Sequence, residues 1–283
     1  MPRHTLLAVV IVGSLATACA GSDTEDTVRS ITDDGVEVAL ATIPTTTTPE
    51  PDGAVEAVVP TTTSEAEDAA PPEIVEDPET LPPIAERNLA GKASGPLDVY
   101  DTPFGQTVVR TIPATTILGT PTVVRILGER GRRYEVALPG RPNGATGWVV
   151  KEDLELFPAL RSIEIDLSER ALWVKDGGEI VFTTQIGVGS PSSPTPPGSF
   201  FITDAVIIQT SAGPWGPYAF GLSARSDTVT EFNGGDGIIG IHGTNRPRSI
   251  GSAQSLGCIR LANEKITELF GLVGVGTPVV ITG

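Results

Sequence analysis

The first third of the chain lacks the side chains from which a hydrophobic core is built. No Phe, Trp or Tyr precedes Tyr100, and residues 22–88 hold 17 acidic side chains against two arginines. Thr and Pro fill much of the remainder, in runs such as residues 45–49 and 60–63. Such a segment cannot bury enough apolar surface to offset the entropy lost on ordering, so residues 22–95 are predicted to be a disordered acidic linker.

The linker carries nearly all of the chain's net charge of −16. Beyond residue 88, 18 acidic and 16 basic residues almost cancel, which excludes a basic face for binding nucleic acid. As a flexible coil the linker would span roughly 45 Å. It is predicted to be a spacer, although a tolerated low-complexity insertion would have the same composition.

Residues 1–21 have the pattern of an export signal. A basic start precedes an apolar run at residues 6–12 that is too short to span a bilayer permanently. The sequence LATAC at residues 15–19 resembles a bacterial lipobox, in which Cys19 would be acylated. We therefore expect an exported protein that is lipid-anchored to the outer face of the cell membrane. An ordinary secretory peptide cleaved near Ala18 or Ala20 is the alternative.

Residues 96–157 have the pattern of a small all-β domain. Strands are expected at residues 107–109, 122–127, 134–138 and 147–150, with Gly- and Pro-containing turns between them. Closely spaced short strands are typical of a small barrel, and the GWV sequence that begins at Gly147 resembles the end of a bacterial SH3-like domain. The resemblance implies docking to peptidoglycan or to the neighbouring domain; a structural spacer is the alternative.

Residues 160–283 are predicted to form a second, mainly β domain with one short helix. Alternation at residues 163–167 begins a series of strands, and a KDGG turn at residues 175–178 closes a hairpin. Further strands are expected near residues 198–203, 219–222, 238–241 and 278–281. Helical spacing of apolar residues occurs over residues 262–272, with Asn263 as the expected N-cap.

Cys258 and His242 form the one Cys–His pair available in this domain. If Cys19 is lipidated or removed with the signal, Cys258 has no cysteine partner in its own chain. A solitary thiol in an exported protein indicates intermolecular pairing, a reactive group or a small buried hydrophobe. A nucleophilic thiol needs a neighbouring imidazole as its base. One His and one Cys are too few for a zinc site, so no metal or cofactor is expected.

The residues around Cys258 favour acyl transfer. Gly257 permits a tight turn that exposes successive backbone N–H groups. The N–H groups of Gly257 and Cys258 are expected to form an oxyanion hole, an interaction typically worth about 3 kcal/mol per donor. Arg260 is expected either to bind a substrate carboxylate or to pair with a structural acid.

Two segments, IHGTN at residues 241–245 and SLGCIRL at residues 255–261, resemble the catalytic signature of the L,D-transpeptidases of the YkuD-domain family. The PTPPGSF sequence at residues 194–200 is a further family-like feature. Leu256 stands where many members have a second histidine, which we infer to be dispensable. Pro197 replaces a small residue or threonine of the middle motif.

The resemblance implies roles for individual residues. Cys258 would be the nucleophile and His242 the base, with a backbone carbonyl at Gly243 or Ser255 orienting the imidazole. Cys258 would attack the third residue of a peptidoglycan tetrapeptide stem, release the terminal D-alanine and pass the acyl group to an amine. A second stem's amine would give a 3→3 crosslink, a protein amine would give anchoring to that protein, and water would give carboxypeptidase activity.

The same resemblance implies acylation of Cys258 by β-lactams of the carbapenem class. Trp215, Tyr218 and Phe220 are expected either to line the cleft for the stem peptide or to pack in the core.

Other classes of protein fit less well. A sortase has a longer His-to-Cys interval, and a papain-like peptidase has its Cys before its His. A non-catalytic wall-binding protein is the alternative of a different class, because the SH3-like segment alone would suffice for binding.

Overall fold

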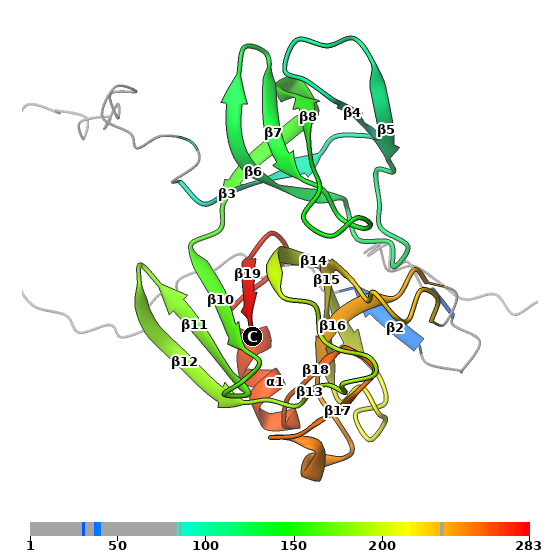
Figure 1. Ribbon diagram of the computed structural model, residues 1–283, viewed down its shortest axis with the longest axis vertical. Coiled ribbons are helices and arrows are strands. Elements are labelled where there is room, and N and C mark those ends of the chain that lie inside the picture. Colours follow the sequence, from blue (N-terminus) through cyan, green and yellow to red (C-terminus); the bar gives the residue numbers. More distant parts are fainter. Residues whose placement is uncertain (1–29, 32–36, 41–83, 85–86, 233–234) are drawn as a thin grey trace, which may run out of the picture.

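A computed structural model describes residues 30–31, 37–40, 84, 87–232 and 235–283 of the chain (Figure 1). The expected export signal with Cys19, and most of the expected linker, lie outside these residues. The described chain is mainly β with one α-helix, as the sequence predicts, and almost all of its strands belong to two sheets.

The first sheet contains seven strands in the order β5-β4-β8-β7-β6-β3-β9. They are β3 (Leu89–Ala93), β4 (Leu97–Tyr100), β5 (Val108–Ile112), β6 (Val123–Arg130), β7 (Arg133–Ala137), β8 (Thr146–Val150) and β9 (Leu154–Pro158). A 3-10 turn, Lys151–Asp153, joins the last two. Leu97, Val99 and Ile126 are fully buried in a core that belongs to this sheet alone.

Strand β3 corrects the predicted end of the linker. Residues 89–93 pair with both β6 and β9, and four of the five are buried. The linker therefore cannot extend to residue 95. Two further short strands within the expected linker, β1 (Ser30–Ile31) and β2 (Glu37–Leu40), pair with each other, and β2 also pairs with β14 (Gly198–Ile208) of the second sheet.

The second sheet has the strand order β12-β11-β10-β19-β14-β15-β16-β18, with β2 paired to β14 and β1 paired to β2. Its other strands are β10 (Arg161–Asp166), β11 (Ala171–Asp176), β12 (Glu179–Gln185), β15 (Tyr218–Arg225), β16 (Ile238–His242), β18 (Ile259–Arg260) and β19 (Pro278–Thr282). A separate pair consists of β13 (Val188–Gly189) and β17 (Ala253–Ser255), and a 3-10 turn covers Pro247–Ser249.

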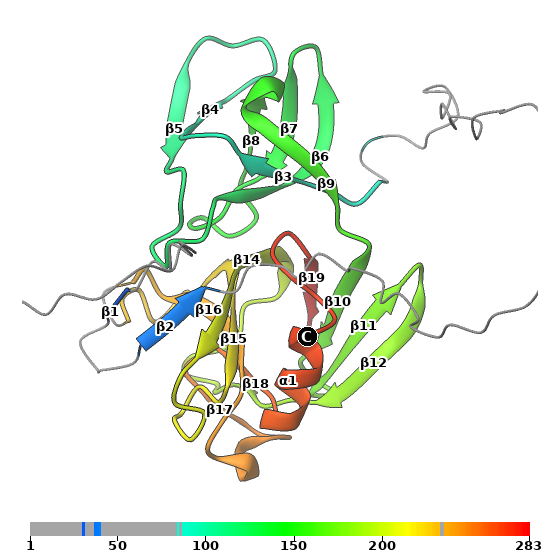
Figure 2. The same ribbon diagram turned by 180° about the vertical axis from the view of Figure 1, so that it is seen from behind.

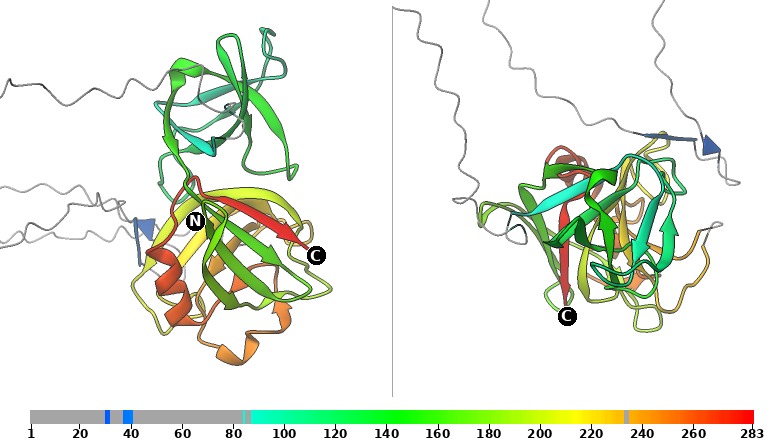
Figure 3. Two further views of the ribbon diagram at one scale, coloured as in Figure 1. Left: turned by 90° about the vertical axis from the view of Figure 1, so that its left-hand side faces the viewer. Right: turned by 90° about the horizontal axis from the view of Figure 1, so that it is seen from above.

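The predicted hairpin between β11 and β12 is present. Gly177 and Gly178 at its turn both have positive φ, 57° and 94°, a conformation that glycine adopts without steric cost. The two sheets lie one above the other in Figures 1 and 2, and the left view of Figure 3 shows the same division.

The single described α-helix, α1 (Asn263–Phe270), packs against β15. Ile266 and Leu269 are buried, and the Phe270 ring stacks on Tyr218 with 4.3 Å between centroids. The prediction of Asn263 as N-cap is wrong: Ala262 occupies that position without a side-chain bond. The Asn263 side chain instead accepts the N–H of Thr244 at 2.8 Å, so it fixes the backbone just after His242. None of the described helices is long and apolar enough to cross a membrane.

Candidate active site

The catalytic candidates lie at the ends of two adjacent strands. β16 and β18 pair in parallel, with Ile241 opposite Ile259 and His242 opposite Arg260. Side chains alternate across a strand, so the two isoleucines are buried in the core while His242 and Arg260 lie on the other face. Cys258 immediately precedes β18 and lines a hollow on that face together with both of them.

Gly240 lies between the side chains of the two catalytic candidates, Cys258 and His242. A Cβ atom at this position would be 3.9 Å from Cys258 Sγ and 4.0 Å from His242 Cδ2. The Gly240 N–H also donates to Cys258 Sγ at 3.4 Å. The structure therefore brings together the Cys and the His that the sequence singled out.

The ring of His242 is held by the carbonyl of Gly243. Nδ1 lies 2.6 Å from that oxygen, and because a carbonyl can only accept, Nδ1 carries the proton and Nε2 is the basic nitrogen. The carbonyl of Ser255 accepts the N–H of Ser190 instead. Of the two carbonyls expected from the sequence, Gly243 is therefore correct and Ser255 is wrong.

The surroundings of Cys258 and His242 favour the neutral form of both side chains. Burial lowers the pKa of His242 to about 4; the hydrogen bond to Gly243 opposes this shift and the nearby Arg260 charge adds to it. Burial raises the pKa of Cys258, partly offset by the Gly240 N–H and by Arg260. A neutral thiol beside a neutral imidazole requires the imidazole to take the proton as the sulfur attacks.

The turn before Cys258 is fixed by the side chain of Ser255. Its Oγ accepts the N–H of Gly257 at 3.1 Å and donates to the carbonyl of Cys258 at 2.6 Å. Gly257 has a φ of +115°, which a residue with a Cβ rarely adopts. The Gly257 N–H donates to Ser255 Oγ in this structure, so its expected role in an oxyanion hole would require that bond to be exchanged. The N–H of Cys258 has no acceptor within the described part of the chain.

Two buried hydroxyl groups that the sequence reasoning missed hold the same turn. Thr195 Oγ1 donates to the carbonyl of Gly257 at 2.8 Å, and Ser193 Oγ donates to that of Leu256 at 2.9 Å. Thr195 lies in the PTPPGSF segment, so the motif was visible in the sequence although its function was not. The side chain of Leu256 is 57% exposed and borders the hollow.

The three aromatic candidates separate into two groups. Trp215 borders the hollow, and its ring centroid lies 4.6 Å from that of His242 and 6.1 Å from that of Phe232. Tyr218 and Phe220 both stack on Phe270 of α1, so they pack in the core. Of the two roles expected for Tyr218, the structure shows packing against α1, outside the lining of the hollow. Phe232, which the sequence reasoning missed, lines the hollow.

Arg260 borders a second hollow as well, of about 500 Å³, which it shares with Arg246 and Arg248. No acidic side chain in the described residues pairs with any of these three arginines. The site therefore presents unneutralised positive charge beside Cys258, which suits a substrate that carries carboxylates.

Comparisons with known proteins identify the family of this domain. Residues 160–281 match the family model of the L,D-transpeptidase catalytic domain, YkuD. The YkuD protein of Bacillus licheniformis, named as an L,D-transpeptidase, is 38% identical over 155 residues, which are 52% of this chain and 86% of that protein. YkuD of Bacillus subtilis is 34% identical over 119 residues, 42% of this chain and 64% of that protein.

Among solved structures, the catalytic domain of the E. faecium L,D-transpeptidase aligns with a TM-score of 0.33 and 25% identity, over 42% of this chain and 95% of that domain. The match to the family model and the extensive identity to the B. licheniformis protein lead to one conclusion: the chain belongs to the YkuD family of L,D-transpeptidases.

Proposed function

We propose that this protein is a peptidoglycan L,D-transpeptidase that uses Cys258 as nucleophile and His242 as base to form 3→3 crosslinks. One observation carries the proposal. Cys258 and His242 flank Gly240 in one hollow, and the imidazole is held through Nδ1 so that Nε2 is free to accept a proton. This is the arrangement that thiol-based acyl transfer needs.

The reaction proceeds in two acyl transfers. As Cys258 Sγ attacks the carbonyl of the third stem residue, His242 Nε2 takes the thiol proton. The bond to the terminal D-alanine breaks, and the imidazolium returns the proton to the departing amine. The amine of a second stem then attacks the thioester and loses a proton to Nε2, and the sulfur leaves as a thiol after regaining that proton. Water in place of the amine would give a carboxypeptidase.

Charge develops on the carbonyl oxygen during both attacks. The unbonded N–H of Cys258 supports a role as oxyanion donor. The same chemistry would open the strained carbonyl of a β-lactam, so we also propose that carbapenems acylate Cys258. Acylation would appear as an increase in protein mass equal to the mass of the drug.

We further propose a division of the chain that starts with a lipidated Cys19 at the outer face of the cell membrane. An acidic linker then leads to a small SH3-like domain formed by residues 89–158 and to a catalytic domain of residues 160–283. The short strands and separate buried core of residues 89–158 support an SH3-like barrel. In this arrangement the linker carries the catalytic domain from the membrane to the cell wall.

The proposed function is tested by incubating the full chain, purified in detergent, with a disaccharide tetrapeptide and identifying the products by mass spectrometry. Loss of D-alanine with formation of a crosslinked dimer is the expected result. Tripeptide without dimer would identify a hydrolase instead. No turnover and no acyl adduct on Cys258 would contradict both and favour a non-catalytic wall-binding protein.

Arg260 is proposed to bind a carboxylate of the stem peptide. Its guanidinium borders both hollows and has no acidic partner among the described residues. In Arg260→Gln we expect KM for the tetrapeptide to rise about tenfold with a smaller change in kcat, since a hydrogen bond to a charged group contributes about 1.5–3 kcal/mol. Steady-state kinetics would measure this. Arg130→Gln, at an exposed position of the first sheet, is the control; an equal effect of both substitutions would contradict the role.

A further inference from the structure

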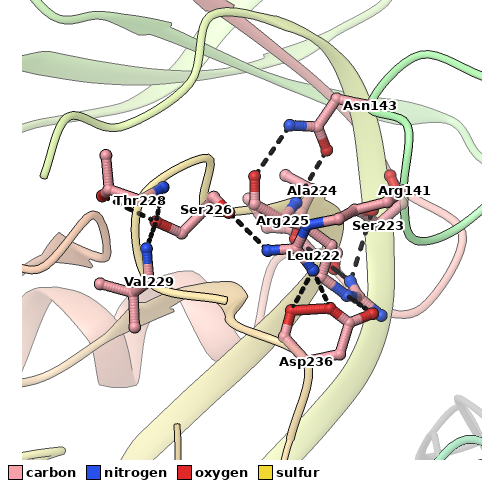
Figure 4. A network of polar contacts seen from close by, with 10 residues as sticks. All are labelled: Arg141, Asn143, Leu222, Ser223, Ala224, Arg225, Ser226, Thr228, Val229 and Asp236. Carbon is pink, nitrogen blue, oxygen red and sulfur yellow. Dashed lines mark hydrogen bonds and ion pairs between the residues drawn. The ribbon is translucent and has the colours of Figure 1, made fainter. Parts of the chain in front are cut away.

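A loop of the first sheet reaches the second sheet close to the active site. This loop, residues 138–145 between β7 and β8, donates the N–H of Gly140 to the carbonyl of Ser223 at 3.0 Å. The Asn143 side chain makes two bonds of 2.8 Å to the backbone of Arg225, one as donor to its carbonyl and one as acceptor from its N–H (Figure 4). Asn143 thus provides hydrogen-bond partners for the backbone N–H and carbonyl at the end of β15, as a neighbouring strand would.

Arg141 of the same loop binds the chain both where it leaves β15 and where it returns to β16. Nη2 donates to the carbonyl of Ser226 at 2.5 Å. Nη1 donates to the carbonyl of Asp236 at 2.7 Å and also to the Asp236 carboxylate. That carboxylate in turn accepts a bond of 3.0 Å from Nε of Arg225, a side chain that is 14% exposed. One guanidinium therefore ties both ends of the intervening segment (Figure 4).

The segment between these ends forms one side of the catalytic hollow. We call its described residues, 226–232 and 235–237, the wall segment. Val229 and Phe232 line the hollow that contains the catalytic pair. The Phe232 ring lies 6.1 Å from that of Trp215, which in turn lies against the catalytic imidazole. The wall segment therefore contributes directly to the space in which a substrate must lie.

The wall segment has little internal support. Its described residues contain neither a helix nor a strand beyond the isolated bridge between Phe232 and Gly235. Ser226 Oγ accepts the N–H groups of Thr228 and Val229. The Ser226 N–H donates to the carbonyl of Gly237 at 2.8 Å, and Phe232 and Gly235 exchange two backbone bonds of 2.9 Å. A segment with few backbone hydrogen bonds of its own opens readily. The position of the wall segment therefore depends on the contacts at its two ends.

We propose that Arg141 and Asn143 are positioning residues of the active site, and that the first sheet shapes the substrate cleft through them. A passive spacer between linker and catalytic domain would not require a charged side chain to bind both ends of the wall segment. The activity measurement below rests on the proposed transpeptidase function, whereas the exchange measurement is independent of it.

Hydrogen–deuterium exchange on the full chain in detergent tests the positioning directly. In Arg141→Ala, the amides of the wall segment should exchange about tenfold faster than in the wild type or more, because bonds to a charged donor are lost at both ends. The matched control is Arg132→Ala. Arg132 lies in the turn between β6 and β7 of the first sheet. Its side chain is 83% exposed and pairs with Glu152, so its loss should leave the exchange unchanged. Unchanged exchange in a folded Arg141→Ala protein would overturn the proposal.

Kinetics separate positioning from general damage. KM for the tetrapeptide is expected to rise about tenfold in Arg141→Ala, while iodoacetamide, a small reagent that needs no cleft, should still alkylate Cys258 at the wild-type rate. Arg141→Lys keeps the charge but cannot bind both ends, so it should restore only part of the loss. Faster exchange with an unchanged KM would overturn the proposal.

The proposal can still be tested if Arg141→Ala does not fold or if the wild type is inactive. If Arg141→Ala does not fold, the same exchange measurement on Asn143→Ala decides, with faster exchange of the wall segment expected and unchanged exchange contradicting the proposal. If the wild type does not turn over the tetrapeptide, the transpeptidase function fails. The exchange result would still support or overturn the positioning of the wall segment.

Discussion

Replacement of Cys258 by alanine is expected to abolish the release of D-alanine from tetrapeptide stems, with a fall in kcat of about a thousandfold or more. The thioester route needs the sulfur, and no other cysteine lies within the described residues to replace it. Release of D-alanine and the mass of the protein after incubation would both be measured. Neither product nor acyl adduct should form.

The effect must be separated from a loss of structure. Cys258→Ser preserves the size of the side chain, but its hydroxyl is far harder for an imidazole of low pKa to deprotonate, so it should lose activity as well. Both variants should melt near the wild-type temperature, because the turn is held by Ser255 and Thr195 rather than by the sulfur. A Cys258→Ala protein that still crosslinks stems would refute the mechanism.

Much of the fold could be predicted because its signals are local. The alternation at residues 163–167 and the paired glycines at 177–178 specify a strand and a hairpin turn within a few positions, and both are present. Asn263 shows where such reasoning fails. The Asn263 side chain can either cap the helix or accept a hydrogen bond from a distant residue. It does the second, because the fold brings the N–H of Thr244 close to it.

The catalytic pair could be predicted for a different reason, which is scarcity of the reactive residue types. Cys258 and His242 had no rivals in the predicted catalytic domain. The hydrogen-bonding groups around the pair could not be predicted in this way. The contact of Ser255 Oγ with the Gly257 N–H, for which an oxyanion would compete, exists only in the folded turn. The wall segment has no periodicity, and the arginine that holds it lies 95 positions earlier in the chain than Asp236.

The acidic limb of the pH profile of kcat/KM is expected near pH 4, because His242 must be neutral to accept the thiol proton and its pKa is lowered to about 4. An ordinary imidazole would already lose this ability near pH 6.5. Protonation as the pH falls removes the base, so activity should persist between these two values and decline below the lower one. Initial rates of D-alanine release between pH 3.5 and about 8, with kcat/KM reporting the free enzyme, would measure the limb.

His242→Gln tests the assignment of that limb. Loss of a general base typically costs about 10²–10⁴-fold in rate, and the remaining reaction should rise with pH as the Cys258 thiolate forms, with no limb near pH 4. Arg260→Gln is the matched test of the electrostatics. The Arg260 charge lowers the pKa of His242, so the acidic limb of Arg260→Gln should lie at higher pH than that of the wild type. A limb near pH 6.5 in the wild type would show that the pKa of His242 is not lowered, and a limb that survives in His242→Gln would show that another group accepts the proton.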